Sequence, residues 1–177
     1  MKVKLLEDEK VRLRPVEPED LEILYTIEND PGMWDKGTVS IPYSRYALHR
    51  FIQETQNDLF VDRQLRLMAE DTSSGEVVGI VDLFNFAPRH LRAEIGIAIF
   101  DAFRRKGYAA KAINLLCNYA HRALHLHSLS AWVAEDNQHS RELFIHCGFK
   151  ENGKLQDWVS TADGFRDVII YQRILDQ

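Results

Sequence analysis

The spacing of hydrophobic residues in the first third of the chain predicts one strand followed by two helices. Residues 11–15 alternate between apolar and charged positions and end at a proline, which is typical of a short strand. Acidic residues and a proline at 17–20 open the first helix, because acids stabilise its positive end and proline suits its first turn. Ser44 is expected to cap the second helix. Residues 33–43 between them have mixed composition and are expected to form a loop.

In the rest of the chain, segments in which apolar and polar residues alternate are separated by two segments with helical periodicity. Helices are predicted at 109–120 and 137–147. No linker or repeat divides the sequence, so we expect a single domain over residues 1–177. The order of elements predicts an α+β fold with a mixed sheet. Its strands are expected at 65–69, 76–86, 92–100, 129–133, 154–160 and 165–175, with a hairpin turn at Asp163-Gly164.

The composition argues against several classes of protein. The chain has a net charge of −5, whereas a nucleic-acid-binding domain usually presents a basic surface. Charged residues among the first ten argue against a secretory signal peptide, and the apolar runs are too short to span a bilayer. Cys117 and Cys147 fall at apolar positions of predicted helices. We expect them to be buried free thiols, which fits a cytoplasmic protein. Together with the charge and the short apolar runs, this predicts no nucleic-acid or membrane partner.

Seven histidines raise the question of a metal site. His121 and His125 have the i, i+4 spacing that can bind zinc on a helix, and His127 follows closely. Arg122 stands where the metalloprotease motif requires a glutamate. We therefore expect no metal in the function of this protein.

The segment from Arg104 to Ala109 is the strongest candidate for a ligand site. It lies between a predicted strand and a predicted helix, and such a junction leaves several backbone N–H groups without partners. These donors and the helix dipole attract anions, and Gly107 lets a phosphate approach the backbone closely. Arg105 and Lys106 add to the positive charge of Arg104. A plain basic helix start is the alternative, and the segment is neither a P-loop nor a Rossmann fingerprint.

Several stretches of the chain resemble the GCN5-related N-acetyltransferase (GNAT) superfamily. Residues 104–109 are similar to that family's Arg/Gln-x-x-Gly-x-Gly/Ala signature. Residues 137–149 are similar to its second cofactor motif. Residues 157–171 resemble the last hairpin of the branch that contains ribosomal-protein alanine acetyltransferases and spermidine acetyltransferases. The resemblance spans residues 11–174, which is nearly the whole chain.

The resemblance implies a mostly antiparallel central sheet flanked by helices, with a V-shaped split between two parallel strands that holds acetyl-CoA. The turn before the helix would meet the pyrophosphate, and the strand before it would pair with the pantetheine arm. Asn137 would offer its amide to the same arm, although it also suits a helix cap. The residues assigned to the cofactor in this way are Ile97, Ala98, Ile99, Arg104, Arg105, Lys106, Gly107, Tyr108, Ala109, Asn137, Ser140 and Phe144.

The implied reaction is transfer of the acetyl group to a primary amine by direct attack on the thioester. The amine must lose a proton before it attacks, and a carboxylate can accept that proton. Glu94 and Asp82 are the candidate bases, because each is an acid in or beside an apolar strand. A salt-bridged or surface role is the alternative for both. Backbone N–H groups of residues 97–99 are the candidates to stabilise the oxyanion.

Two departures from the family pattern affect the expected function. Many members have a tyrosine that protonates the CoA thiolate, but Phe144 stands at the matching position and cannot donate a proton. Either water or Ser140 protonates the thiolate, or no dedicated acid is required. A non-catalytic acyl-CoA-binding or sensor module is the alternative function. The acids expected before the second helix are replaced by residues 40–43, although Asp30 and Asp35 are nearby. Both departures set the chain apart from spermidine acetyltransferases.

The acceptor is expected to enter between residues 29–46 and the last hairpin. A protein N-terminus, a polyamine and a small amine all stay open as acceptors, and a homodimer is expected by analogy with the family. For Phe84 and Phe86, burial in the core is the alternative to lining the entrance. The apolar residues that are candidates to line it are Met33, Trp34, Tyr43, Phe84, Phe86 and Trp158.

Overall fold

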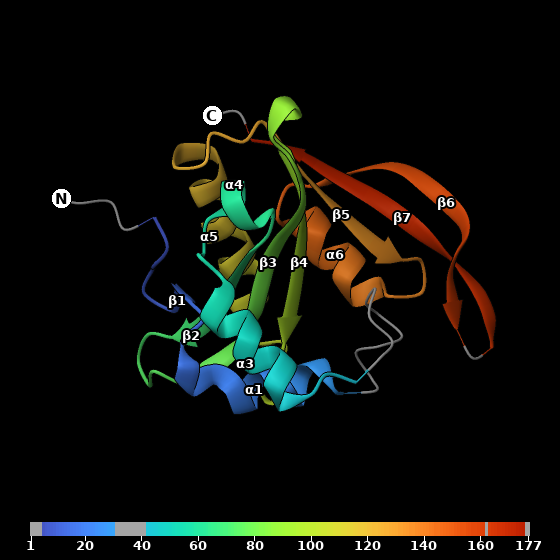
Figure 1. Cartoon of the computed structure of the whole chain (residues 1–177). Helices are drawn as coiled ribbons and strands as arrows, with labels where there is room; N and C mark the ends of the chain where they lie inside the picture. The colour runs from blue at the N-terminus through green and yellow to red at the C-terminus, as the bar shows by residue number, and fades with distance from the viewer. Residues whose placement is uncertain (1–4, 31–41, 162, 176–177) are drawn as a thin grey trace.

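A computed structural model describes residues 5–30, 42–161 and 163–175, and within these ranges one seven-stranded sheet runs through the molecule (Figure 1). Its strand order is β1-β2-β3-β4-β5-β7-β6. Every neighbouring pair is antiparallel except β4 and β5, which confirms the predicted mixed sheet. The strands are β1 (Val11–Pro15), β2 (Leu65–Asp71), β3 (Val77–Ala87), β4 (Arg92–Ile99), β5 (Ser128–Ala134), β6 (Lys150–Thr161) and β7 (Gly164–Ile174).

Helices cover both faces of the sheet. Those described are η1 (Pro18–Asp20), α1 (Leu21–Glu28), α3 (Arg45–Glu54), α4 (Leu59–Asp62), η2 (Pro88–His90), η3 (Asp101–Phe103), α5 (Tyr108–Arg122) and α6 (Gln138–His146). One buried cluster joins α5 and α6 to the sheet, and a second joins α1 and α3 to it. Because side chains alternate along a strand, Ile95 of β4 faces the first cluster and Ala98 faces the second.

Capping residues set the helix starts that the sequence predicts. The Ser44 hydroxyl accepts a 3.1 Å hydrogen bond from the backbone of Ala47 and caps α3, as expected. The short helix α4 is not predicted by the sequence pattern. It starts after Asp58, whose side chain accepts a 2.8 Å hydrogen bond from the backbone of Phe60. Four residues are too few to show a helical period, so only the cap could have indicated this helix.

Two strands extend beyond their predicted bounds by two residues or more at one end. The first strand of the C-terminal hairpin, β6, begins at Lys150 rather than at 154, because Lys150 already pairs with Gln172 of β7. Its first residues are polar and exposed, as is common on an edge strand, and they hide the alternation. The strand β2 similarly continues to Asp71, which pairs with Val11.

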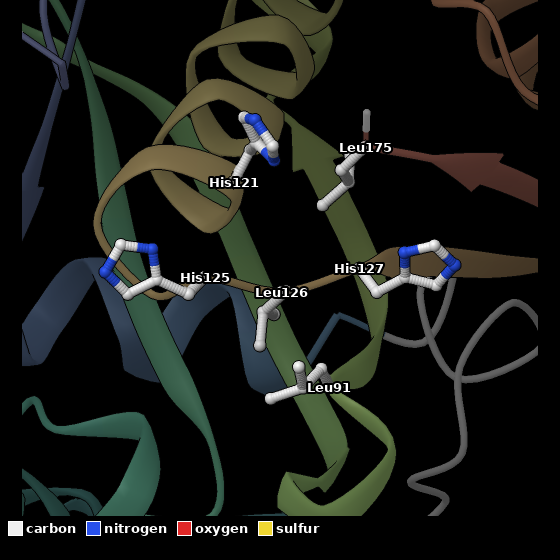
Figure 2. A pocket seen from close by; sticks show the side chains of 6 residues that line it. All are labelled: Leu91, His121, His125, Leu126, His127 and Leu175. Carbon is white, nitrogen blue, oxygen red and sulfur yellow. The ribbon is translucent and has the colours of Figure 1, made fainter. Parts of the chain in front are cut away.

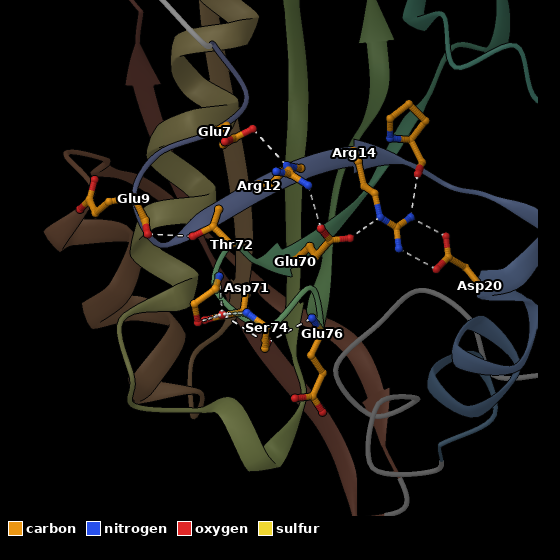
Figure 3. Close-up of polar contacts among 12 residues, drawn as sticks. Glu7, Glu9, Arg12, Arg14, Asp20, Glu70, Asp71, Thr72, Ser74 and Glu76 are labelled. Carbon is orange, nitrogen blue, oxygen red and sulfur yellow. Dashed lines mark hydrogen bonds and ion pairs between the residues drawn. The ribbon is translucent and has the colours of Figure 1, made fainter.

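Ion pairs hold the first strand to its neighbours (Figure 3). The guanidinium of Arg14 donates to Asp20 at 2.7 and 3.0 Å and to Glu70 at 2.7 Å. Burial of Asp20 by itself raises the pKa of the carboxyl, but the hydrogen bonds from Arg14 and from the backbone of Glu17, together with the charge of Arg14, outweigh it and lower the pKa overall. The contact fixes β1, β2 and the start of α1 relative to one another.

Candidate active site

The two parallel strands at the centre of the sheet separate after a short paired stretch. Pairing of β4 with β5 runs from Arg92 opposite Ser128 to Glu94 opposite Ser130. Beyond these positions β4 continues to Ile99 with β3 as its only strand partner in the described chain, while β5 stays paired with β7. Figure 1 shows the two strands diverging. This is the predicted V-shaped split, and it leaves backbone groups of β4 open on one side.

The open arm of β4 lies unusually close to β3. A β-carbon on Gly79 would lie 2.2 Å from the carbonyl oxygen of Ala98, so a larger residue is excluded there. Residues 97–99, which we predict to meet the pantetheine arm, occupy this stretch and are half-buried. The close approach fixes the strand that borders the split.

The turn that precedes α5 has the backbone of an anion-binding site. Arg105 and Gly107 both adopt left-handed conformations, with φ values of 60° and 86°. Such residues turn successive N–H groups toward one side of the chain. In the described part of the chain, the N–H groups of residues 105–110 have no hydrogen-bond acceptor. They lie at the N-terminus of a 15-residue helix, whose dipole favours a negatively charged ligand.

Two of the three basic side chains in this turn contact residues close to them in the sequence. Arg104 pairs with Asp101 at 2.7 Å and donates a 3.1 Å hydrogen bond to the carbonyl oxygen of Ile99. The ammonium of Lys106 lies 5.5 Å from the ring centre of Phe103. Arg104 therefore links the turn to the end of β4, a structural role that the sequence did not indicate.

The third basic side chain reaches the other helix that borders the split. Nη2 of Arg105 lies 3.1 Å from Nε2 of His139, in the first turn of α6. A guanidinium only donates, so Nε2 is the acceptor in this contact. Next to it, Asn137 caps α6 by accepting a 3.2 Å hydrogen bond from the backbone of Ser140. The cap uses the oxygen of Asn137 and leaves its N–H donors for the predicted contact with the cofactor.

The start of α5 is also braced from the opposite side. The hydroxyl of Tyr108 donates a 2.6 Å hydrogen bond to Asp71 at the end of β2. Lys10 donates to the backbone oxygen of Lys106, and its ammonium lies 4.7 Å from the centre of the Tyr108 ring. One turn further along the helix, Lys111 pairs with Glu9 at 2.7 Å. The segment before β1 thus holds the turn in place.

Phe144, at the position where many family members have a tyrosine, lies in the core. Its side chain is 4% exposed and packs edge-to-face on Phe149, with ring centres 5.1 Å apart. It has no polar atom. Its predicted contact with the cofactor therefore concerns only a small part of the ring, and the structure places no proton donor on this side chain.

The two candidate bases have different partners. Asp82 accepts hydrogen bonds from Arg66 on both carboxylate oxygens, at 2.7 and 3.1 Å, and Arg66 also pairs with Glu28. Glu94 accepts one hydrogen bond, at 3.1 Å, from the neutral amide of Asn85. Asn85 lies in a β-bulge and has a φ of 48°, and such bulges re-aim side chains. Glu94 is also the last residue of β4 to pair with β5, so it lies where the split begins.

Comparison with known proteins identifies the family. A family model described as an acetyltransferase (GNAT) domain matches residues 10–150, which is most of the chain. The chain belongs to this family. The acetyltransferase is 27% identical to the uncharacterized N-acetyltransferase YoaA of Bacillus subtilis over 169 residues, 94% of each chain. It is 26% identical to the spermidine N(1)-acetyltransferase of Vibrio cholerae over 159 residues, 90% of each.

The fold of the acetyltransferase agrees with this assignment. The crystal structure of spermidine N-acetyltransferase from Vibrio cholerae in complex with CoA and spermine matches it with a TM-score of 0.85. The match covers 95% of this chain and 97% of that chain, and at 24% identity it shows a shared fold. The resemblance to the GNAT superfamily is confirmed, and the protein is an N-acetyltransferase.

The residues predicted to line the acceptor entrance of the acetyltransferase are only partly brought together. Met33 and Trp34, like Asp35, lie outside the described residues. Phe86 is buried in the first core cluster, as its alternative interpretation expected. Phe84 is half-buried, and its ring lies 3.2 Å from where a β-carbon of Gly96 would be. Tyr43 packs against the second cluster, and Trp158 is exposed.

Three residues near the site were not singled out from the sequence. Arg66 is a charged residue inside an apolar strand, which is the same signal that indicated Asp82, and it could have been noticed in that way. His139 and Lys10 carry no local signal, because each reaches the cofactor turn from a distant part of the chain. Contacts of this kind depend on the fold and cannot be found by pattern.

The three histidines that are close together in the sequence lie away from the split. His121, His125 and His127 border a cavity at the far end of α5, and Figure 2 shows their rings pointing in different directions. Among residues 5–30, 42–161 and 163–175, no three His, Cys, Asp or Glu side chains are grouped closely enough to hold a metal ion. Within the same ranges, every helix is too short or too polar to cross a membrane.

Proposed function

We propose that the protein transfers the acetyl group of acetyl-CoA to a primary amine by direct attack of the amine on the thioester. The proposal rests on one observation, which is that an open strand edge and an anion-binding turn follow each other along the chain. The open edge of β4 leads directly into a turn whose N–H groups at 105–110 have no acceptor in the described chain. An extended ligand that ends in phosphates fits this combination. The Vibrio cholerae neighbour, which shares the fold, is described as a complex with CoA.

Residues of this chain have distinct roles in holding the donor. The backbone of residues 97–99 offers hydrogen bonds to an extended amide-containing arm, in the way that one strand pairs with another. The N–H groups of the turn bind the pyrophosphate, and Gly107 keeps that surface free of a side chain. Arg105, which donates to His139, places further guanidinium donors between the two helices. Asn137 offers its amide N–H groups beside the same opening.

Glu94 is the better candidate for the base that accepts the proton of the amine. Both oxygens of Asp82 already accept hydrogen bonds from a guanidinium, so an amine would have to compete with Arg66. Glu94 has a neutral partner, Asn85, and lies where the strands begin to separate. A general base must lie within hydrogen-bond reach of its proton, directly or through one water. We assign Asp82 a structural role.

Two negative charges form during the reaction, one on the oxyanion and one on the CoA thiolate. Backbone N–H groups in residues 97–99 are placed to stabilise the oxyanion that forms when the amine attacks. The CoA thiolate leaves without a dedicated acid at Phe144, because a phenyl ring has no proton to give. Ser140 is half-buried at the start of α6, and its hydroxyl is our candidate donor to the thiolate, with water as the alternative.

We place this activity in the cytoplasm. Cys117 and Cys147 are both buried and unpaired with each other, which suits a reducing compartment. Self-association into a homodimer stays a prediction from the family.

The direct test measures thiol release from acetyl-CoA with a panel of primary amines. We expect turnover with at least one amine, and we expect Glu94→Gln to lower kcat about 100-fold or more. Asp82→Asn is the matched control, since it removes one carboxylate on the same face and should act mainly on stability. Full turnover of Glu94→Gln would show that the base is assigned wrongly, and acetyl-CoA binding without thiol release for any amine would overturn the reaction itself.

A further inference from the structure

Two tryptophans form an exposed aromatic wall beside the split. Trp132 of β5 and Trp158 of β6 have ring centres 5.7 Å apart, and they are 42% and 55% exposed. A register shift in β6 between Leu155 and Val159 interrupts the regular pairing where Trp158 lies. Large aromatic side chains are usually mostly buried, so two that contact each other and still face solvent indicate a binding surface. It is a ready surface for stacking.

The wall lies on the same face of the sheet as the proposed base. Glu94 and Ser130 are register partners, so their side chains share one face. Trp132 is two residues further along β5 and therefore points to that face as well. It lies on the arm of β5 that diverges from β4. An amine whose nitrogen approaches Glu94 would therefore carry its substituent toward the two rings.

The acids on this face do not provide a row of sites for a polycation. Of the carboxylates that β3 and β4 place there, Asp82 is held by Arg66, and only Glu94 has a neutral partner. Glu28 of α1 also pairs with Arg66. A second ammonium group would have to displace the guanidinium, which is held by both carboxylates in a largely buried position. Burial by itself lowers the pKa of Arg66, but Asp82 and Glu28 outweigh it and raise the pKa.

We propose that Trp132 and Trp158 form the acceptor-binding wall, and that the preferred acceptor is a small primary amine with one cationic centre and an aromatic or bulky apolar substituent. This inference rests on the proposed acetyl transfer and names its substrate class. Glu94 takes the proton of the amine, and the rings hold the substituent by stacking and apolar contact. The cationic form of the amine is also attracted to the faces of the rings as it enters.

The test compares kcat/KM for four acceptors with the full-length enzyme and saturating acetyl-CoA: 2-phenylethylamine, n-butylamine, spermidine and a tetrapeptide with a free N-terminus. We expect 2-phenylethylamine to exceed each of the others by roughly tenfold, the usual scale for one aromatic contact. Trp132→Ala should remove that preference through KM for the amine, and leave KM for acetyl-CoA unchanged. Trp132→Phe should restore part of it.

A matched control uses another exposed aromatic residue. Phe60 is 49% exposed on α4, away from the last hairpin, and Phe60→Ala should leave the order of acceptors unchanged. A preference for spermidine or the peptide, or tryptophan variants with unaltered KM, would overturn the inference while the acetyl transfer stands. A dimer that Trp132→Ala dissociates would also overturn it, because the wall would then be a subunit contact. Absence of thiol release with every amine would instead refute the proposed reaction.

Discussion

The hydroxyl of Tyr108 donates a 2.6 Å hydrogen bond to Asp71, and the contact joins the first residue of α5 to the last residue of β2. Asp71 also accepts hydrogen bonds from the backbone N–H groups of Ser73 and Ser74, in the turn drawn in Figure 3. The turn between β2 and β3 and the turn before α5 are thus held by a single carboxylate. A residue far along the chain from the turn at 104–109 therefore helps to set the shape of the proposed acetyl-CoA site.

Removing that hydrogen bond is expected to weaken donor binding and leave the chemistry intact. For Tyr108→Phe we predict a rise of roughly threefold to tenfold in KM for acetyl-CoA with little change in kcat, because one charge-assisted hydrogen bond is lost. Steady-state kinetics with varied acetyl-CoA measure this. Tyr46→Phe, on an exposed face of α3, is the control. An unchanged KM would show that the brace does not position the turn.

The same bond has a consequence for acid stability. Hydrogen bonds from Ser73 and Tyr108 hold the pKa of Asp71 well below its usual range. A carboxyl with a lowered folded pKa stabilises the protein above its ordinary pKa, and the contribution is lost as the pH falls through the folded value. Tyr108→Phe moves the folded pKa of Asp71 back toward its ordinary value, so the variant lacks part of this stabilisation at neutral pH. Its unfolding midpoint in acid titrations followed by circular dichroism should therefore lie at a higher pH than that of the wild type. Coincident titrations would contradict this.

Gly107 is expected to be required for its backbone conformation. Its φ of 86° is left-handed, and the nearest atom to an added β-carbon would be Nζ of Lys10 at 3.9 Å. Gly107→Ala therefore meets strain rather than a clash, and should cost about 1 kcal/mol, or about 2–4 °C in Tm. Gly153→Ala is the control, since Gly153 has open space and no left-handed φ. Equal Tm values for the two variants would show that the turn relaxes.

Asp82→Asn should affect folding more than catalysis. The substitution leaves Arg66 paired with Glu28, in a position where the side chains are about one-fifth exposed. Partial loss of a charge-assisted, mostly buried pair should lower the free energy of unfolding by about 1–3 kcal/mol. Urea unfolding measures it. Glu54→Gln, which breaks an exposed i, i+4 pair with Arg50, should cost less than about 0.5 kcal/mol.

The cysteines are expected to be inert in the folded protein. Burial raises the pKa of Cys117 to about 12 and that of Cys147 to about 11. The thiolate fraction at pH 8 is then lower than that of a free thiol by about 100-fold or more. Titration with a thiol reagent should detect both cysteines only after denaturation. Burial of the neutral thiols also favours the folded state. Because their folded pKa values are raised, this stabilisation is lost as the pH rises from about 9 toward 12. A rapid reaction at pH 8 in buffer would contradict the prediction.

Local signals predicted most of the fold. The Ser44 cap, the alternation of the central strands and the junction at Arg104 each depend on neighbouring residues, and each is present in the structure. The pairing of Asp82 with Arg66 joins residues on two strands, so the sequence left its role open between base and ion pair. The burial of Phe144 is of the same kind. A pattern shows which residue types are present, but the partner of each is decided by packing.

The separation of β4 from β5 also has a thermodynamic consequence. The two halves of the sheet meet through pairing that ends at Glu94 and Ser130, so the sheet is least tightly joined at its centre. A donor bound along both arms would be present only in the folded protein. Its binding would then raise the free energy of unfolding in proportion to the logarithm of donor concentration, once this exceeds Kd. Under the proposed function, the thermal resistance of this enzyme would report the supply of acetyl-CoA.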